Sequence, residues 1–221
     1  MQVDLEDLAA GYSHRPTSAA GVARARRAGD SADLGVGDVA LDIGGGRGQQ
    51  ARSWFERRAS PFLIDQSRGI TQAAAAVAGV TSIRALAQAI PLRDGCARLA
   101  YFHLSIHYGN WRKALDEVRR VIAPGGECWI WTMGERHHRE SFLAQCFPSV
   151  GDIDAARVPD PDDLVEYLGA MGLITEMGKE VEHKNRPAGE WRASVAAGFV
   201  STLKLITSDE LANGLGLFDT E

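Results

Sequence analysis

The chain of 221 residues has only three cysteines, Cys96, Cys128 and Cys146, which are odd in number and widely spaced. They form neither a disulfide framework nor a zinc-binding spacing, so we expect free thiols, no metal and a reducing, cytoplasmic location. A surplus of basic residues is also missing, because the formal net charge is −5. We therefore expect no nucleic-acid partner bound through general basicity and no anionic membrane surface as a partner.

Long apolar runs are absent as well. No stretch approaches the ~18 apolar residues that cross a membrane. The N-terminal sequence MQVDLEDLAAGY is acidic and lacks a basic-then-apolar signal region. Apolar residues nevertheless make up 45% of the chain, which is enough for a substantial core. We expect a single domain over residues 1–221.

From residue 38 onward, short apolar runs alternate with helical patterns. The expected strands cover residues 38–43, 61–67, 80–87, 96–104 and 127–133, and the expected helices between them cover 48–59, 69–79 and 110–126. Strands that alternate with helices indicate crossover connections between parallel strands. The sequence therefore predicts an α/β fold of the Rossmann-like, doubly wound type, with a mostly parallel sheet and helices on both faces.

Four glycines surround the end of the first expected strand. In VALDIGGGRGQQ, Asp42 comes just before Gly44, Gly45 and Gly46, and Gly48 opens the next helix. Ligands of parallel sheets lie beyond the carboxyl ends of strands, and glycine lets a ligand approach the backbone. The carboxylate of Asp42 would repel a pyrophosphate and attract an ammonium group. The spacing G-x-G-x-G also differs from the dinucleotide pattern G-x-G-x-x-G, which disfavours a nicotinamide-dependent oxidoreductase.

A second acid, Asp65, closes the next expected strand, 17 residues after Gly48. This position suits hydrogen bonds to ribose hydroxyls from the neighbouring strand. A glycine turn beside one acid, together with a ribose-binding acid, fits a ligand that has an amino-acid end and a nucleoside end. These features favour S-adenosylmethionine.

At these residues the sequence resembles the class I S-adenosylmethionine-dependent methyltransferases, in their small-molecule branch with the ubiquinone and menaquinone methyltransferases. ALDIGGGRG is similar to the first family motif and FLIDQS to the second, and IPLRDG and RVIAPGG follow in the family's order. The resemblance implies in-line methyl transfer to a small-molecule O, N or C nucleophile, with S-adenosylhomocysteine as the product. It also implies a helical cap over residues 1–30, a cofactor-binding core over 38–133, a substrate-cap insertion over 134–165 and a C-terminal part over 166–221.

The resemblance implies roles for particular residues. Asp42 would order the glycine turn and help to hold the ammonium group, and Asp65 would bind the ribose hydroxyls. The implied cofactor-binding set is Asp42, Gly44, Gly45, Gly46, Gly48, Asp65, Gln66, Ser67, Ala87, Gln88 and His103. Structural explanations stand beside these roles: a tight turn for the glycines, a helix N-cap for Asp65 and, for His103, a histidine that bonds the backbone at a helix start.

The acceptor side of the implied site follows the fourth expected strand. His107 would act as a general base toward a hydroxyl or a protonated amine, since its pKa lies near neutrality, or it would only bond the backbone at a helix start. Tyr12, Tyr108 and Trp111 would line the acceptor pocket, with Tyr12 as a lid over the cofactor. Helix packing is the alternative for Tyr12, and a core position is the alternative for Trp111.

Several features depart from the family pattern. Leu86 stands where an acid often meets the adenine amino group, and Arg98 replaces an acid. Residues 173–185 look like a sixth strand, but the tail after them is mostly helical, with no convincing seventh strand. A missing strand would leave an exposed sheet edge, which favours a homodimer. These departures keep open an alternative, a non-catalytic binding or regulatory subunit with the methyltransferase fold.

Three further segments receive a structural interpretation. The basic cluster GVARARRAG is expected to form a solvated helix face. Residues 134–160 are expected to form a helix followed by a turn-rich loop, with GERHHRE as a solvated polar segment instead of a metal site, because adjacent histidines point apart on a helix. Trp129 and Trp131 lie two residues apart on an expected strand, so they should share one face and pack against a helix.

Overall fold

The structure is a computed structural model that describes residues 6, 18–182, 185 and 187–219. It divides into two compact units, one within residues 16–132 and the other formed mainly by residues 133–221. Tyr12, predicted to line the acceptor pocket, lies outside the described residues. All of the other predicted site residues belong to the first unit, since they lie between Asp42 and Trp111.

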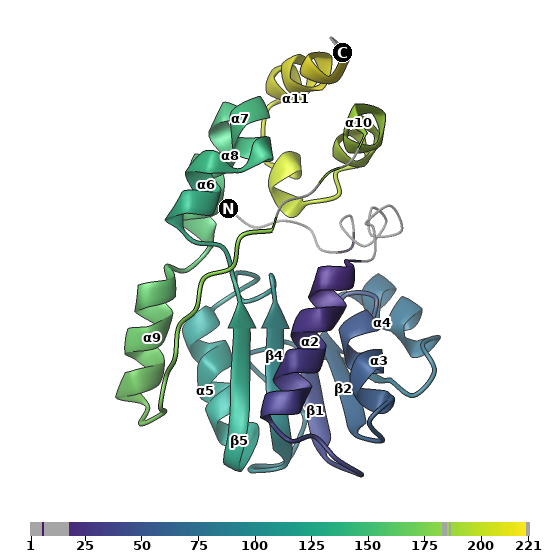
Figure 1. Cartoon of the computed structure of the whole chain (residues 1–221), viewed down its shortest axis with the longest axis vertical. Helices are drawn as coiled ribbons and strands as arrows, with labels where there is room; N and C mark the ends of the chain where they lie inside the picture. Colours follow the sequence, from purple (N-terminus) through teal and green to yellow (C-terminus); the bar gives the residue numbers. More distant parts are fainter. Residues whose placement is uncertain (1–5, 7–17, 183–184, 186, 220–221) are drawn as a thin grey trace. The chain divides into compact units, whose positions relative to one another are not determined.

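The first unit contains a parallel sheet, which has five strands within the described residues (Figure 1). The strands are β1 (Val39–Ile43), β2 (Ser60–Asp65), β3 (Thr81–Arg84), β4 (Ala97–His103) and β5 (Ile122–Trp131), in the spatial order β3-β2-β1-β4-β5. Every neighbouring pair runs parallel. The predicted α/β, Rossmann-like fold is confirmed. The order reverses between β1 and β4, and open α/β sheets bind ligands at such a switch point.

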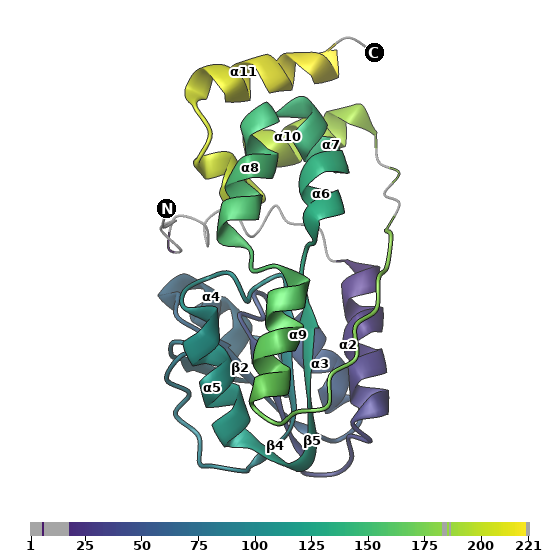
Figure 2. The same cartoon turned by 90° about the vertical axis from the view of Figure 1, so that its left-hand side faces the viewer.

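Helices cover both faces of this sheet. They are α2 (Ala19–Ser31), α3 (Gln49–Phe55), α4 (Arg68–Ala75) and α5 (Trp111–Val121). Figure 2 shows α2 and α3 packed together on one side of the strands and α5 on the other. Side-chain caps fix where helices begin: Asn110 accepts a hydrogen bond from the Lys113 amide at 3.1 Å at the start of α5. The buried residues of α5 recur at helical spacing, as its sequence predicts.

Trp54 joins α3, α2 and the sheet. Its buried indole N–H donates to the Ala25 carbonyl oxygen of α2 at 2.7 Å, and its ring meets Tyr101 of β4 edge-on, with 5.6 Å between centroids. Gly29 lets α2 approach closely, because a Cβ there would lie 3.0 Å from the Trp54 ring. This contact fixes α2 and α3 over the face of the sheet that carries Tyr101.

The two tryptophans of β5 pack against the buried cluster that includes α2, as predicted. The prediction of a solvated basic face is wrong for Arg24, which is only 7% exposed. Its guanidinium lies 4.4 Å from the centre of the Trp131 ring, so a cation–π contact compensates for its burial. Arg26 is exposed and pairs with Glu56 at 3.0 Å.

The second unit is helical within the described residues. Its α-helices are α6 (Glu135–Glu140), α7 (Phe142–Cys146), α8 (Pro148–Arg157), α9 (Pro161–Ala170), α10 (Ala188–Ala196) and α11 (Ser208–Gly216), with 3₁₀ turns η2 (Ser201–Lys204) and η3 (Leu217–Asp219). Its core is built from Phe147, Val150, Val195, Leu203 and Phe218. In the described part of the chain, no helix is long and apolar enough to cross a membrane.

Two secondary-structure predictions are wrong in this unit. The first error concerns the second part of residues 134–160, which was expected to be a loop but forms α7 and α8. Pro148 starts α8, at a position in a helix where proline is well tolerated. Residues 173–182 form no strand, and Ile174 is 99% exposed. Among the described residues, this segment pairs with no strand, and strand preference depends on such a partner.

Candidate functional site

The strand register places three polar side chains on one face at the carboxyl edge of the sheet. Asp42 of β1 lies opposite Leu63 of β2, and Asp65 follows two residues later, so both carboxylates share that face. Asp42 also lies opposite Tyr101 of β4, and His103 follows two residues later on the same face. The structure therefore brings together the two acids and the histidine that were predicted to bind the cofactor.

Asp42 is fully buried, with 0% of its surface exposed. One carboxylate oxygen, Oδ2, accepts a hydrogen bond from the Ala51 amide at 3.3 Å, whereas Oδ1 has no partner among the described residues. Burial raises the pKa of Asp42 to about 7; the Ala51 hydrogen bond lowers that pKa, and the nearby charge of Asp65 raises it. A buried carboxylate oxygen without a partner is unfavourable, so this geometry fits a cationic group such as an ammonium.

The glycine turn is shaped by contacts within the chain. Gly44, Gly46 and Gly48 have positive φ angles of 69°, 56° and 72°, which favour glycine. A Cβ at Gly44 would lie 2.5 Å from the Cβ of Ser105, and a Cβ at Gly45 would overlap the Asp42 carboxylate. Glycine at positions 44 and 45 is thus required by neighbouring side chains of the protein itself, and the turn presents bare backbone beside Asp42.

Asp65 ends β2, where a short turn leads into α4. Its Oδ1 accepts a hydrogen bond from the Ser67 amide at 2.9 Å, and the Ser67 hydroxyl accepts one from the Ile70 amide at 3.2 Å. The N-cap of α4 is therefore Ser67 and not Asp65. Gln66, between them, is half-buried, and its carbonyl oxygen accepts from Arg84 Nε at 3.1 Å. These bonds orient the Asp65 carboxylate at the strand end.

His103 lies between the sheet and α2. Its ring stacks almost parallel to that of Tyr101, with 6.1 Å between centroids. A Cβ at Gly21 of α2 would lie 3.2 Å from His103 Cε1 and 3.2 Å from Gln50 Nε2, so the three residues are in close contact. Core packing accounts for part of the position of His103, and its place at the carboxyl end of β4 keeps it beside the glycine turn. The sequence analysis did not single out Gly21 or Gln50.

The residues after β4 form a tight segment. Leu104 has a φ of +56°, which is rare for a residue with a branched side chain, and its amide donates to the Trp131 carbonyl oxygen at 2.9 Å. Ser105 is buried, and its hydroxyl donates to the Ile43 carbonyl oxygen at 2.6 Å. Neither residue was predicted from the sequence. A serine inside the apolar run YFHLSIHY, just past a strand, is the signal that could have revealed Ser105, because a buried hydroxyl needs a partner.

The predicted acceptor residues follow directly. The rings of His107 and Tyr108 are in contact, with 4.2 Å between centroids. Trp111 is the first residue of α5, and the Arg112 guanidinium lies 4.0 Å from the centre of its ring. Gln88 lies against the same segment, because a Cβ at Gly109 would approach Gln88 Nε2 to 2.5 Å. The structure thus brings residues 87–88 next to the segment that carries His107 and Tyr108.

Two further observations concern metal binding and the segment GERHHRE. Among the residues that the structure describes, no group of three or more His, Cys, Asp or Glu side chains is placed to hold a metal ion. Within GERHHRE, residues Glu135–Glu140 form the helix α6, in which Arg136 pairs with Glu140 at 2.6 Å and Arg139 with Glu135 at 3.0 Å. The segment is largely exposed, as predicted, except for His138, which is buried.

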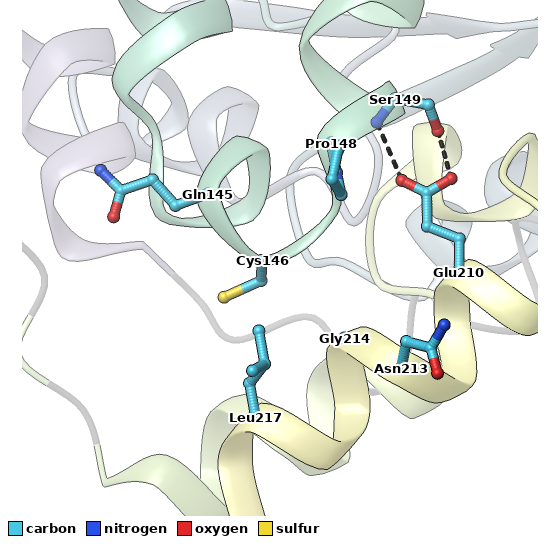
Figure 3. Close-up of a pocket in the computed structure, with 8 residues that line it drawn as sticks. All are labelled: Gln145, Cys146, Pro148, Ser149, Glu210, Asn213, Gly214 and Leu217. Atoms are coloured by element: carbon cyan, nitrogen blue, oxygen red, sulfur yellow. Dashed lines mark hydrogen bonds between the residues drawn. The ribbon is translucent and has the colours of Figure 1, made fainter.

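A pocket of about 530 Å³ opens between α7, α8 and α11 (Figure 3). The Glu210 carboxylate, at its edge, accepts hydrogen bonds from the backbone amide of Ser149, at 2.8 Å, and from the Ser149 hydroxyl. None of the predicted site residues lines this pocket. These hydrogen bonds connect α8 to α11, and both carboxylate oxygens of Glu210 take part in them.

Residues 41–130 match the family model described as a methyltransferase domain. The matched stretch contains the glycine turn, Asp65, the segment after β4 and α5. The match and the sheet order together make residues 41–130 similar to a methyltransferase domain of the S-adenosylmethionine-dependent class, whose cofactor is S-adenosylmethionine and whose product is S-adenosylhomocysteine.

The chain is 31% identical, over 149 residues, to the ubiquinone/menaquinone biosynthesis C-methyltransferase of Acidiphilium cryptum (strain JF-5). That alignment covers 58% of this chain, and the chain spans just over half of that relative, 56% of its length.

Solved structures show the same fold. A candidate methyltransferase from an antibiotic biosynthesis pathway of Anabaena variabilis ATCC 29413 has a TM-score of 0.75 at 21% identity, over 90% of this chain and 84% of that one. Geranyl diphosphate C-methyltransferase from Streptomyces coelicolor A3(2) has a TM-score of 0.57 at 12% identity, over 89% of this chain and 72% of that one.

Proposed function

We propose that the protein transfers a methyl group from S-adenosylmethionine to an O, N or C nucleophile of a small molecule. One observation carries the proposal: Asp42 is fully buried, its Oδ1 has no partner among the described residues, and it lies beside a bare glycine turn on the same sheet face as Asp65. This arrangement offers one carboxylate to an ammonium group and a second carboxylate to a sugar, at the ligand-binding edge of the sheet.

The residues present fit the cofactor. Asp42 and the backbone of the glycine turn would hold its amino-acid end, and Asp65, with Gln66 and Ser67 beside it, would hold the ribose and border the adenine. Ala87 and Gln88 would lie along the adenine ring. Leu86 is 48% exposed and cannot accept a hydrogen bond from the adenine amino group, so that bond falls to Gln88 or to backbone carbonyls. When bound, the cofactor supplies a methyl group activated by a sulfonium.

The protein would also align the acceptor with the methyl group and remove a proton from the acceptor. Holding the acceptor in line with the methyl group converts a bimolecular reaction into an effectively unimolecular one. His107 would accept the proton of a hydroxyl or a protonated amine, while Tyr108, Trp111 and Tyr12 would line the acceptor pocket. The contact between the His107 and Tyr108 rings supports a shared role in placing the acceptor.

Carbon nucleophiles are the first acceptors to test. The relative from Acidiphilium cryptum is named as a C-methyltransferase of ubiquinone and menaquinone biosynthesis, and the structure from Streptomyces coelicolor is a geranyl diphosphate C-methyltransferase. We propose an electron-rich ring or alkene carbon as the favoured nucleophile, with phenolic oxygens and amines as the other classes.

The test is a methyl-transfer assay with three acceptor panels: quinols and prenyl compounds, phenols, and amines. S-adenosylhomocysteine is measured by mass spectrometry, and calorimetry measures the binding of S-adenosylmethionine itself. Product that depends on an acceptor supports the proposal. Cofactor binding without product from any panel would support the non-catalytic alternative, and no binding at millimolar cofactor would exclude the proposed function.

A further inference from the structure

We infer that Ser105 is a positioning residue that joins the cofactor-binding glycine turn to the acceptor segment of residues 107–108. The inference rests on the proposed function, because it concerns how the two halves of that site are held together. Its support comes from four contacts of Ser105 and its neighbour Leu104, all within the first unit.

The first contact is the hydroxyl hydrogen bond. Ser105 Oγ donates at 2.6 Å to the carbonyl oxygen of Ile43, the last residue of β1, across a sequence separation of 62 residues. Both groups are buried, since Ser105 is 8% and Ile43 2% exposed. On the other side of β1, the Gly44 amide donates to the Ile64 carbonyl oxygen at 2.7 Å. The start of the glycine turn is thus held from both neighbouring strands.

The second contact is steric. The Ser105 side chain lies against Gly44 so closely that a Cβ at position 44 would come within 2.5 Å of it. Gly44 has a φ of +69°, so the turn already adopts a conformation that most residues avoid. Ser105 therefore limits the positions that the Gly44 backbone can take.

The third and fourth contacts extend to the acceptor segment. Leu104 turns the chain with a φ of +56°, and its amide donates to the Trp131 carbonyl oxygen of β5, which aims Ser105 back toward β1. The Ser105 carbonyl oxygen then accepts from the Tyr108 amide at 3.1 Å. One residue thus bonds the glycine turn through its side chain and the acceptor segment through its backbone. A rare backbone conformation beside a site is a common sign of a functional constraint.

The experiment compares Ser105→Ala with a matched variant, Ser53→Ala. Ser53 is buried as well, at 3% exposure, and its hydroxyl donates to the Gln50 carbonyl oxygen at 2.7 Å within α3. Both variants therefore lose one buried hydroxyl-to-carbonyl bond. Each is measured for its melting temperature, for its dissociation constant for S-adenosylhomocysteine, and for the shift of the His107 Cε1–H NMR signal when that ligand saturates the protein. A His107→Gln spectrum assigns the signal.

We expect both variants to melt at similar, lower temperatures. Ser105→Ala should weaken S-adenosylhomocysteine binding about three- to tenfold, the effect of one lost hydrogen bond, and should lose the ligand-induced shift of the His107 signal. Ser53→Ala should keep both. Ser105→Cys, which keeps the side-chain size with a weaker donor, should fall between the wild type and Ser105→Ala.

Two results would overturn the inference: unchanged ligand affinity in Ser105→Ala, or a His107 shift that persists in this variant at saturation. If Ser105→Ala is too unstable to measure, the same two measurements on Ser105→Cys test the inference: unchanged affinity or an unchanged His107 shift in that variant would overturn it. A wild-type protein that does not bind S-adenosylhomocysteine would refute the proposed function instead, so the two failures are distinguishable.

Discussion

At the scale of single residues, Asp42 is a buried carboxyl whose charged form is costly. Its carboxyl is fully buried, and its pKa is raised from 3.8 to about 7. Between these two pH values the folded protein binds a proton that the unfolded chain does not bind, so the stability of the ligand-free protein falls as the pH rises. The pKa shift of Asp42 corresponds to about 4 kcal/mol in the free energy of unfolding. This contribution is present at low pH and is lost above pH 7.

Replacing Asp42 by asparagine removes this titration. The free energy of unfolding of Asp42→Asn, relative to the wild type, should therefore increase from pH 5 to pH 8 in the absence of ligand. The affinity of the wild type for S-adenosylhomocysteine should increase over the same range, because the charged carboxylate pairs with the ammonium group, whereas the variant should bind weakly at every pH. Urea unfolding and calorimetry at four pH values measure both effects, and parallel profiles for the two proteins would contradict the assignment.

The sequence could predict part of the site at this scale. Asp42, the glycines and Asp65 are recognisable because strand ends, turns and acids lie close together in the sequence. Ser105 is different, since its partner Ile43 is 62 residues away and no local pattern pairs a hydroxyl with a particular carbonyl. The reason for glycine at positions 44 and 45 is also not visible in the sequence. The side chains of Ser105 and Asp42 occupy the space that a Cβ at these positions would need.

At the scale of elements, Trp54 connects α3 to α2 and to β4, and α3 begins directly after the glycine turn. Trp54→Phe would lose the hydrogen bond to the Ala25 carbonyl oxygen and leave a cavity beneath α2. We expect it to lower the free energy of unfolding by about 2–4 kcal/mol. Phe55→Leu, a neighbour on α3 that is 48% exposed, should cost less than about 1 kcal/mol. Chemical denaturation measures both; equal losses would show that Trp54 does not hold the helix pair together.

Periodicity predicted the strands and helices of the first unit well, because each has an apolar run or face that the packed sheet and its covering helices bury. It failed where tertiary context decides. Residues 173–182, expected as part of a strand, pair with no strand among the described residues, and the segment around Pro148, expected as a loop, forms α7 and α8. Arg24 lies in a basic cluster typical of a solvated face, and its contact with the ring of Trp131, far away in the sequence, is not visible in a local pattern.

At the scale of the whole molecule, the proposed cofactor site lies entirely within the first unit. Its residues come from the carboxyl ends of β1, β2 and β4 and from the turn after β3. All of them lie within the family match over residues 41–130. The chain spans 56% of its relative from Acidiphilium cryptum, so its own acceptor must be established on this protein.

The most direct test of the central claim is a crystal structure of the protein with S-adenosylhomocysteine. We predict that the Asp65 carboxylate lies within hydrogen-bonding distance of the ribose hydroxyls and that the amino-acid end lies against the glycine turn, near Asp42. A ligand bound elsewhere, for example in the pocket between α7, α8 and α11, or an Asp65 carboxylate that makes no contact with the sugar, would contradict the account.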